Sequence, residues 1–308
     1  MHITSRHGLI SLNSQIESIS INANSLSNDI NYIGNSKNIS PNKNMKRNYI
    51  YSPFNNTDLL IYDTLSKFIF KKNDTEIIFK NKVQFDNFCK QIESEKWIIT
   101  EFVKKKLPNL SEKHVDSLVN NFCEKYTYNN PKYSFDEINN PSPNIYVIGH
   151  GSPGVDTISP TPTSNMKKEI FDFELVTHLL KAQLPLDAKI KLDFCWSAAS
   201  KSSSSAKADE INELFFTSKL EQVVGDPKES FMGTFFQELI ERVPSFSGVV
   251  QGYQGVVLAD VKDGVLCKSK TLGTHFAVAM PSSDNTNEIF IRKSHARVTF
   301  SNKNLSSF

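Results

Sequence analysis

The pattern of apolar and polar positions changes twice along the chain and predicts three parts. Residues 1–50 are crowded with Ser and Asn and show no sustained apolar period, so we expect this segment to be largely disordered. In residues 51–140 apolar positions recur at three-to-four spacing, which predicts a helical region. In residues 141–308 short apolar runs alternate with helical stretches, which predicts an α/β domain.

Two helices are predicted in the helical region, over 85–107 and 111–126. Pro108 ends the first, and Ser111 is placed to cap the second. Cys89 and Cys123 lie among apolar positions of these helices, so we interpret them as buried structural thiols.

The α/β domain begins with a strand over 144–149, a continuous apolar run of the kind found in strands buried on both faces of a parallel sheet. Strand, helix and strand at this spacing predict right-handed crossovers and hence an αβα sandwich with a mainly parallel sheet. The further strands are expected at 188–194, 247–253, 255–261 and 297–300, and the helices at 168–182, 206–223 and 231–243.

Composition narrows the classes of function. The 35 basic and 33 acidic residues leave a net charge of +2, which does not favour nucleic acid or a membrane surface as the main partner. No apolar run reaches the roughly 18–20 residues of a spanning helix, and no secretory signal peptide is recognisable at the N-terminus. The four cysteines lack CxxC or Cys/His spacing, so we expect reduced thiols and no metal site.

The strongest candidate chemistry lies at the ends of two predicted strands. His150 and Gly151 follow the first strand, and Cys195 follows the next. The carboxyl ends of neighbouring parallel strands share one edge, where open α/β sheets bind their ligands. A thiolate with a nearby imidazole can attack a peptide carbonyl, and the N–H groups of Gly151 and Cys195 can form an oxyanion hole. The pattern therefore predicts a Cys-His dyad.

These two blocks, IYVIGHG and IKLDFCWSA, resemble the motifs of the caspase-like clan of cysteine peptidases, which includes legumains, clostripain and gingipains. The GHG signature and the spacing look most like the self-processing protease domains of large bacterial toxins and related injected effectors. The resemblance covers Asn144 to Phe300. It implies a cysteine endopeptidase of caspase-like fold with Cys195 as nucleophile and His150 as catalytic histidine.

The sequence also departs from the clan's pattern. Trp196 stands where many members have a small residue, and Asp193-Phe194 replaces the Gln-Ala of caspases, which argues against cleavage after Asp. The toxin domains imply an apolar residue, commonly Leu, before the cleaved bond. Asp193 and Trp196 are candidates to line a specificity pocket. The alternative for Asp193 is a structural role in which it braces a loop. The acids available to orient the histidine are Asp86, Asp136 and Asp156, and the sequence does not choose among them.

The resemblance further implies activation by inositol hexakisphosphate, which binds a basic pocket on a β-rich flap after the catalytic cysteine. Clustered Lys and Arg suit a phosphate-dense ligand, although a solvated basic face explains them equally well. The basic residues of the corresponding region here are Lys262, Lys268, Lys270, Arg292, Lys293 and Arg297.

The sequence as a whole predicts a bacterial virulence effector that cleaves host proteins or itself in the host cytosol after injection, with a secretion chaperone as an expected partner. The Ser/Asn-rich segment 1–50 is then the delivery signal, although a low-complexity tail accounts for its composition too. Two alternatives stay open: an inactive caspase-like binding module, and a cysteine deamidase or acyltransferase. A serine hydrolase built on Ser152 or Ser197 is not favoured, because no GxSxG motif is present.

Overall fold

The computed structural model describes residues 48–70, 75–138, 141–161, 169–217, 219–257, 265–267, 270–272, 277–284 and 289–302. The expectation for residues 1–47 therefore lies outside the described residues. The last three residues assigned to the leader, Asn48, Tyr49 and Ile50, belong instead to the first strand.

A six-stranded sheet runs in the order β13-β7-β6-β3-β1-β2. Five strands are parallel, and β13 pairs antiparallel with β7 at one edge. The prediction of an α/β fold with a mainly parallel sheet is confirmed. The strands are β1 (Asn48–Tyr51), β2 (Thr75–Ile78), β3 (Asn144–Ile148), β6 (Lys189–Asp193), β7 (Val249–Tyr253) and β13 (Arg297–Ser301).

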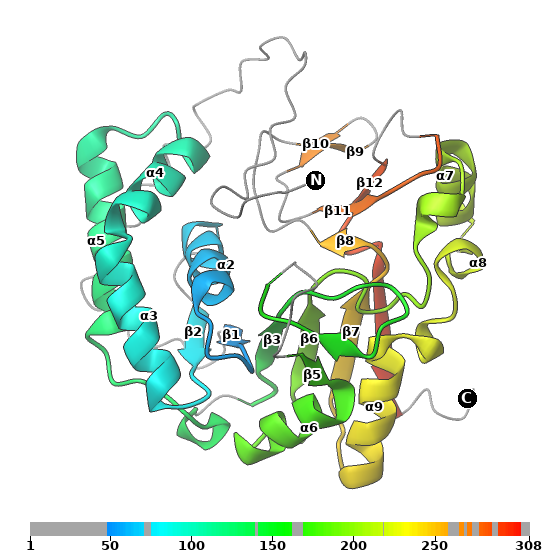
Figure 1. Cartoon of the computed structure of the whole chain (residues 1–308), viewed down its shortest axis with the longest axis horizontal. Helices are drawn as coiled ribbons and strands as arrows, with labels where there is room; N and C mark the ends of the chain where they lie inside the picture. The colour runs from blue at the N-terminus through cyan, green and yellow to red at the C-terminus, as the bar shows by residue number, and fades with distance from the viewer. Residues whose placement is uncertain are drawn as a thin grey trace, which may run out of the picture. The chain divides into compact units, whose positions relative to one another are not determined.

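Helices cover both faces of this sheet (Figure 1). Successive side chains of a strand point to opposite faces, and β3 shows which helices each face meets. Ile145 and Val147 pack with α6 (Asp172–Lys181) and α9 (Phe231–Arg242). Tyr146 and Ile148 pack on the other side, in the apolar cluster formed with α2 (Asp58–Phe70), α3 (Lys82–Ser94), α4 (Lys96–Lys106) and α5 (Glu112–Thr127). The result is a three-layer αβα arrangement.

Three local expectations need correction. The single helix expected over 85–107 is broken at Glu95 into α3 and α4. The helix expected over 206–223 is likewise two helices, α7 (Ala208–Phe216) and α8 (Glu221–Val224). The helical region also supplies β2 and the last residue of β1, Tyr51, to the sheet, so the expected boundary near residue 140 does not separate helices from sheet. Each of these strands has only four residues, too few for a clear alternation.

Smaller β elements surround the carboxyl edge of the sheet. β4 (Thr157–Ile158) pairs with β5 (Ile170–Phe171). β8 (Val256–Val257), β11 (Ala277–Met280) and β12 (Ile289–Arg292) form an antiparallel sheet that shares an apolar cluster with α7 and α8. The remaining elements are β9 (Val265–Cys267), β10 (Lys270–Leu272) and the short helices η1 (Phe135–Glu137), η2 (Ser203–Ser205) and η3 (Pro227–Glu229).

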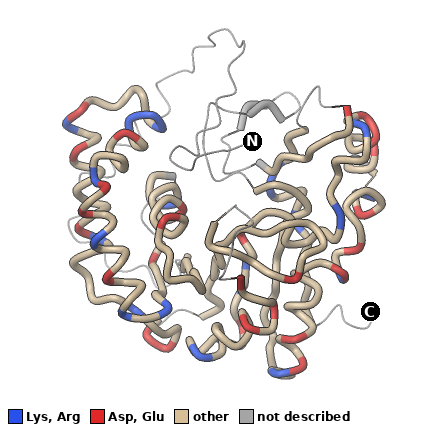
Figure 2. The backbone as a smooth tube through the Cα atoms, in the orientation of Figure 1, with Lys and Arg blue, Asp and Glu red and all other residues tan. Residues whose placement is uncertain are grey.

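Acidic and basic residues both occur along α3, α4 and α5 (Figure 2), and α4 ends in three consecutive lysines, Lys104, Lys105 and Lys106. Among the described residues, no helix has the length and apolar character needed to cross a membrane. The same residues contain no group of three or more His, Cys, Asp or Glu side chains arranged to hold a metal ion.

Candidate functional site

The structure brings the two sequence-predicted motifs to one edge of the sheet. β3 and β6 are adjacent parallel strands, with Ile148 opposite Asp193 at their carboxyl ends. His150 and Cys195 each lie two residues beyond these ends. β1 and β2 lie on one side of β3, whereas β6 and β7 lie on its other side. The order of the strands in the chain therefore reverses beside β3. Open α/β sheets bind ligands at such a point.

The backbone of His150 is fixed by the strand beside it. Its N–H donates to the Ser159 carbonyl at 2.8 Å, and its own carbonyl accepts from the Ser159 N–H at 2.9 Å. Ser159 directly follows β4, so the β4–β5 pair supports the histidine. The side chain is half-buried, and this burial lowers the pKa of His150 below 6.5. The imidazole is therefore neutral at pH 7 and able to accept a proton.

The loop after β3 packs directly on the loop after β6, and two glycines permit the contact. A Cβ at Gly151 would lie 2.5 Å from the Cys195 carbonyl oxygen, and a Cβ at Gly154 would lie 2.5 Å from that of Ser200. Gly154 also has a φ of +69° and donates its N–H to the Ala199 carbonyl at 3.3 Å. Only glycine combines this backbone conformation with so close an approach.

Cys195 stands at the start of a sharp turn. Trp196, the next residue, has a φ of +57°, an outlying conformation for a bulky side chain that costs about 1–3 kcal/mol. Its N–H donates to the Gly255 carbonyl at 2.8 Å, and its indole is buried in the cluster shared with α7 and α8. The strain is thus held in place by the turn between β7 and β8 and by packing. Trp196 lies in a packed cluster and is only 6% exposed.

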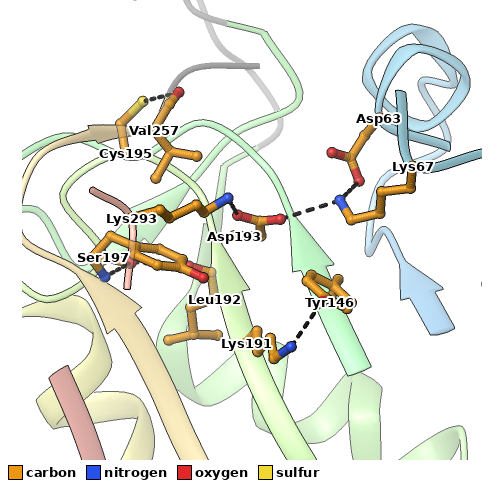
Figure 3. Close-up of polar contacts among 11 residues, drawn as sticks. Asp63, Lys67, Tyr146, Lys191, Leu192, Asp193, Cys195, Ser197, Val257 and Lys293 are labelled. Atoms are coloured by element: carbon orange, nitrogen blue, oxygen red, sulfur yellow. Dashed lines mark hydrogen bonds and ion pairs between the residues drawn. The ribbon is translucent and has the colours of Figure 1, made fainter. Parts of the chain in front are cut away.

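The thiol of Cys195 is hydrogen bonded to the backbone and is not ionised. Its Sγ donates to the carbonyl of Val257 at 3.7 Å (Figure 3). Burial raises the pKa of this thiol above 9.0. In the part of the chain that the structure describes, no hydrogen bond joins the His150 imidazole to this sulfur or to any other group. The cysteine is accordingly held as the neutral thiol.

Two backbone N–H groups in these loops have no carbonyl partner among the described residues. Across the described ranges, no carbonyl accepts a hydrogen bond from the N–H of Gly151 or of Cys195. Buried N–H groups are almost always paired in folded proteins. An oxyanion hole requires such unpaired donors close to the nucleophile.

A buried charge network is centred on Asp193, which Lys293 approaches from the side of the thiol and Lys67 from the opposite side (Figure 3). The Asp193 side chain is 4% exposed and forms ion pairs with Lys67 of α2, at 3.2 Å, and with Lys293, which follows β12. Lys67 pairs with Asp63 as well, and its ammonium lies 4.7 Å from the centre of the Tyr146 ring. Burial alone lowers the pKa of Lys67, but Asp63 and Asp193 outweigh it and hold that pKa above its ordinary value.

This network defines the environment of two predicted site residues. Asp193 forms ion pairs with two lysines of the chain itself, so its carboxylate connects β6 with α2 and with the turn after β12. Lys293 is turned inward and its side chain is 17% exposed, whereas Arg292 and Arg297 are exposed. Lys262, Lys268 and the side chain of Lys270 lie outside the described residues.

None of the three candidate acids hydrogen bonds to His150 in the described structure. Asp86 pairs with Lys82 on the surface of α3, and Asp136 lies exposed in η1. The backbone carbonyl of Asp156 accepts from the Asp172 N–H.

Sequence reasoning missed Lys67 and the structural part played by Ser197. Lys67 had a detectable signal, because it is a single basic residue in the apolar helix DLLIYDTLSKFIF with Asp63 one turn before it. The Ser197 hydroxyl is completely buried and bonds the backbone of β6 and β7. Nothing in the sequence around Ser197 marks those bonds.

Comparison of the chain with protein-family models, with curated proteins and with solved structures found no match in any of the three.

The buried network predicts a large loss of stability for Asp193→Asn. This change removes the negative charge that Lys67 and Lys293 share, and breaking a buried ion pair costs about 3–5 kcal/mol. Urea unfolding followed by circular dichroism measures the free energy of unfolding. Asp86→Asn is the matched control, because it breaks an ion pair whose side chains are 42% and 77% exposed and is expected to cost at most about 1 kcal/mol. Equal losses for the two variants would contradict the role of Asp193.

The environment of the thiol predicts a pH profile. Because burial raises its pKa, the rate at which iodoacetamide alkylates Cys195 in the unliganded protein should still be rising at pH 9.0. Mass spectrometry of the peptide that contains Cys195 gives this rate separately from the other cysteines. A plateau reached below pH 7 would instead indicate a preformed thiolate-imidazolium pair.

Proposed function

We propose that the protein is a cysteine endopeptidase of the caspase-like type, in which Cys195 is the nucleophile and His150 the catalytic histidine. The observation that carries the proposal is the contact between the two loops, in which Gly151 lies against the Cys195 backbone at the carboxyl edge of adjacent strands. The resemblance of IYVIGHG and IKLDFCWSA to the motifs of that clan supports the same assignment.

In the proposed reaction, the neutral imidazole of His150 takes the proton of the Cys195 thiol as the sulfur attacks the carbonyl carbon of the cleaved bond. The negative charge that develops on the carbonyl oxygen is stabilised by the open N–H groups of Gly151 and Cys195. The C–N bond breaks as the imidazole of His150 delivers a proton to the departing amine. Water then hydrolyses the thioester and restores the thiol.

The resting thiol gives a second candidate function some weight. A raised pKa, a hydrogen bond to Val257 and an imidazole without a partner in the described structure also fit an inactive module that only binds proteins. A deamidase or acyltransferase would use the same two residues on a different bond.

Labelling with a peptidyl acyloxymethyl ketone that carries Leu next to the reactive group tests the peptidase proposal. We expect one adduct, on Cys195, and no adduct in Cys195→Ala. In His150→Ala the reaction should be at least about 100-fold slower, because a positioned acid-base group contributes about 10²–10⁴-fold. Cys89→Ala and Cys123→Ala, which alter half-buried thiols of α3 and α5, are the controls and should label at the wild-type rate. An unlabelled Cys195 would favour the inactive module, and the mass of a cleaved or deamidated substrate separates the two enzyme classes.

We further propose that inositol hexakisphosphate switches the enzyme on. Arg292 and Arg297 support this, because they are exposed at either end of the turn between β12 and β13. Guanidinium groups are well suited to bind phosphate. Lys293 in this turn joins Asp193, two residues before the thiol, so the turn is connected to the site.

The activator is tested by measuring the labelling rate of Cys195 against the concentration of inositol hexakisphosphate, with inositol as the uncharged control. The rate should rise with the polyphosphate alone. Arg292→Gln combined with Arg297→Gln should raise the half-maximal concentration by at least about tenfold, since a hydrogen bond to a charged group is worth about 1.5–3 kcal/mol. Arg242→Gln, an exposed arginine of α9, is the matched control. A response identical in all three proteins would remove these arginines from the proposed site.

We propose that bacteria inject the protein into host cells, where it acts as an effector on host proteins, and that a secretion chaperone is its partner before injection. The Ser/Asn-rich composition of residues 1–50 and the resemblance to injected proteases support it.

A further inference from the structure

Ser197 is a buried hydroxyl in the turn that carries Cys195, and it is completely shielded from solvent. Its Oγ donates to the Leu192 carbonyl of β6 at 3.0 Å and accepts from the Tyr253 N–H of β7 at 2.9 Å. The hydroxyl therefore spans the two strands between which the turn leaves the sheet.

The backbone of the turn is anchored on both sides of this hydroxyl. The Ser197 carbonyl accepts from the Met232 N–H in the first turn of α9 at 2.8 Å. The N–H of Ala198 donates to the Tyr253 carbonyl at 3.0 Å. There is also little room for movement, because a Cβ added at Gly252 would lie 3.0 Å from the Ser197 Oγ.

These bonds oppose the strain at Trp196. A bulky residue with φ near +57° relaxes unless its surroundings hold it, and relaxation of the turn would rotate the neighbouring Cys195. The Gly255 carbonyl holds the N–H of Trp196, and the next residue, Ser197, is held by its hydroxyl bonds to Leu192 and Tyr253. The direction of the Cys195 side chain thus depends on the Ser197 hydroxyl.

We infer that Ser197 is the positioning residue of the nucleophile: its hydroxyl ties β6 to β7 and fixes the turn in which Cys195 faces Gly151. The inference rests on the proposed peptidase function. It assigns Ser197 no contact with the substrate, so its effect is on the geometry of attack rather than on binding.

The test compares two reagents on wild type and Ser197→Ala. The peptidyl ketone reports the oriented attack of Cys195, whereas iodoacetamide reports only the exposure and ionisation of the thiol. We expect the maximal rate of inactivation by the ketone to fall about 10- to 100-fold, as misplacement of a reacting group by about 1 Å does. The half-saturating ketone concentration and the iodoacetamide rate at the same pH should change less than about threefold if geometry alone is altered.

Ser203→Ala is the matched control. Ser203 is also completely buried and donates its hydroxyl to a backbone carbonyl, that of Pro281, at 2.6 Å, but it belongs to η2. A loss of stability alone would affect both variants and would raise the iodoacetamide rate. Ser197→Thr keeps the oxygen and should restore the maximal ketone rate to within about tenfold of wild type, which keeps the test decisive should Ser197→Ala not fold.

The inference is overturned by a wild-type maximal rate in folded Ser197→Ala, or by equal losses in Ser197→Ala and Ser203→Ala. An unlabelled wild-type Cys195 would overturn the peptidase proposal itself and the inference with it. The two failures are distinguishable, because the first leaves the wild-type adduct on Cys195 in place.

Discussion

The carboxylate of Asp193 connects parts of the chain that are far apart in sequence. It closes β6, receives Lys67 from α2 on one side and Lys293 from the turn after β12 on the other, and has a side chain only 4% exposed. Such a charge is tolerated in the interior only while its partners stay in place. The carboxyl edge of the sheet, α2 and the turn after β12 are therefore held in one arrangement. Cys195 follows this anchor by two residues.

The candidate site is built on that edge by backbone contacts more than by side chains. Ser159 holds His150, glycines at 151 and 154 let one loop pack on the other, and β7 holds the strained turn at Trp196. The side chains of His150 and Cys195 are not paired with each other: the imidazole is neutral, and the thiol is hydrogen bonded to the Val257 carbonyl. The proposed catalytic state then differs from this one mainly in the thiol and imidazole, while the surrounding backbone is already in place.

The sequence predicted what depends on local pattern. The run Asn144–Ile148 became β3, the alternation ending at Asp193 became β6, and the placement of His150 and Cys195 beyond those strands followed from parallel topology. It missed β1 and β2, because four-residue strands carry too little pattern. The ion pairs of Asp193 and the bond between Ser197 and Tyr253 join residues far apart in the chain, so no local period could reveal them. The ion pair of Lys293 with Asp193 could not be predicted for the same reason. The basic residues near the C-terminus carry the same charge in the sequence, and only the fold shows that Lys293 points inward.

The central claim is that Cys195 attacks a carbonyl with the help of His150. The most direct measurement is the intact mass of the protein after mixing with a blocked leucine p-nitrophenyl ester and quenching with acid. The account predicts a transient acyl adduct that maps to Cys195, forms much more slowly in His150→Ala and is absent in Cys195→Ala. Absence of any adduct on wild-type Cys195, with or without inositol hexakisphosphate, would contradict it.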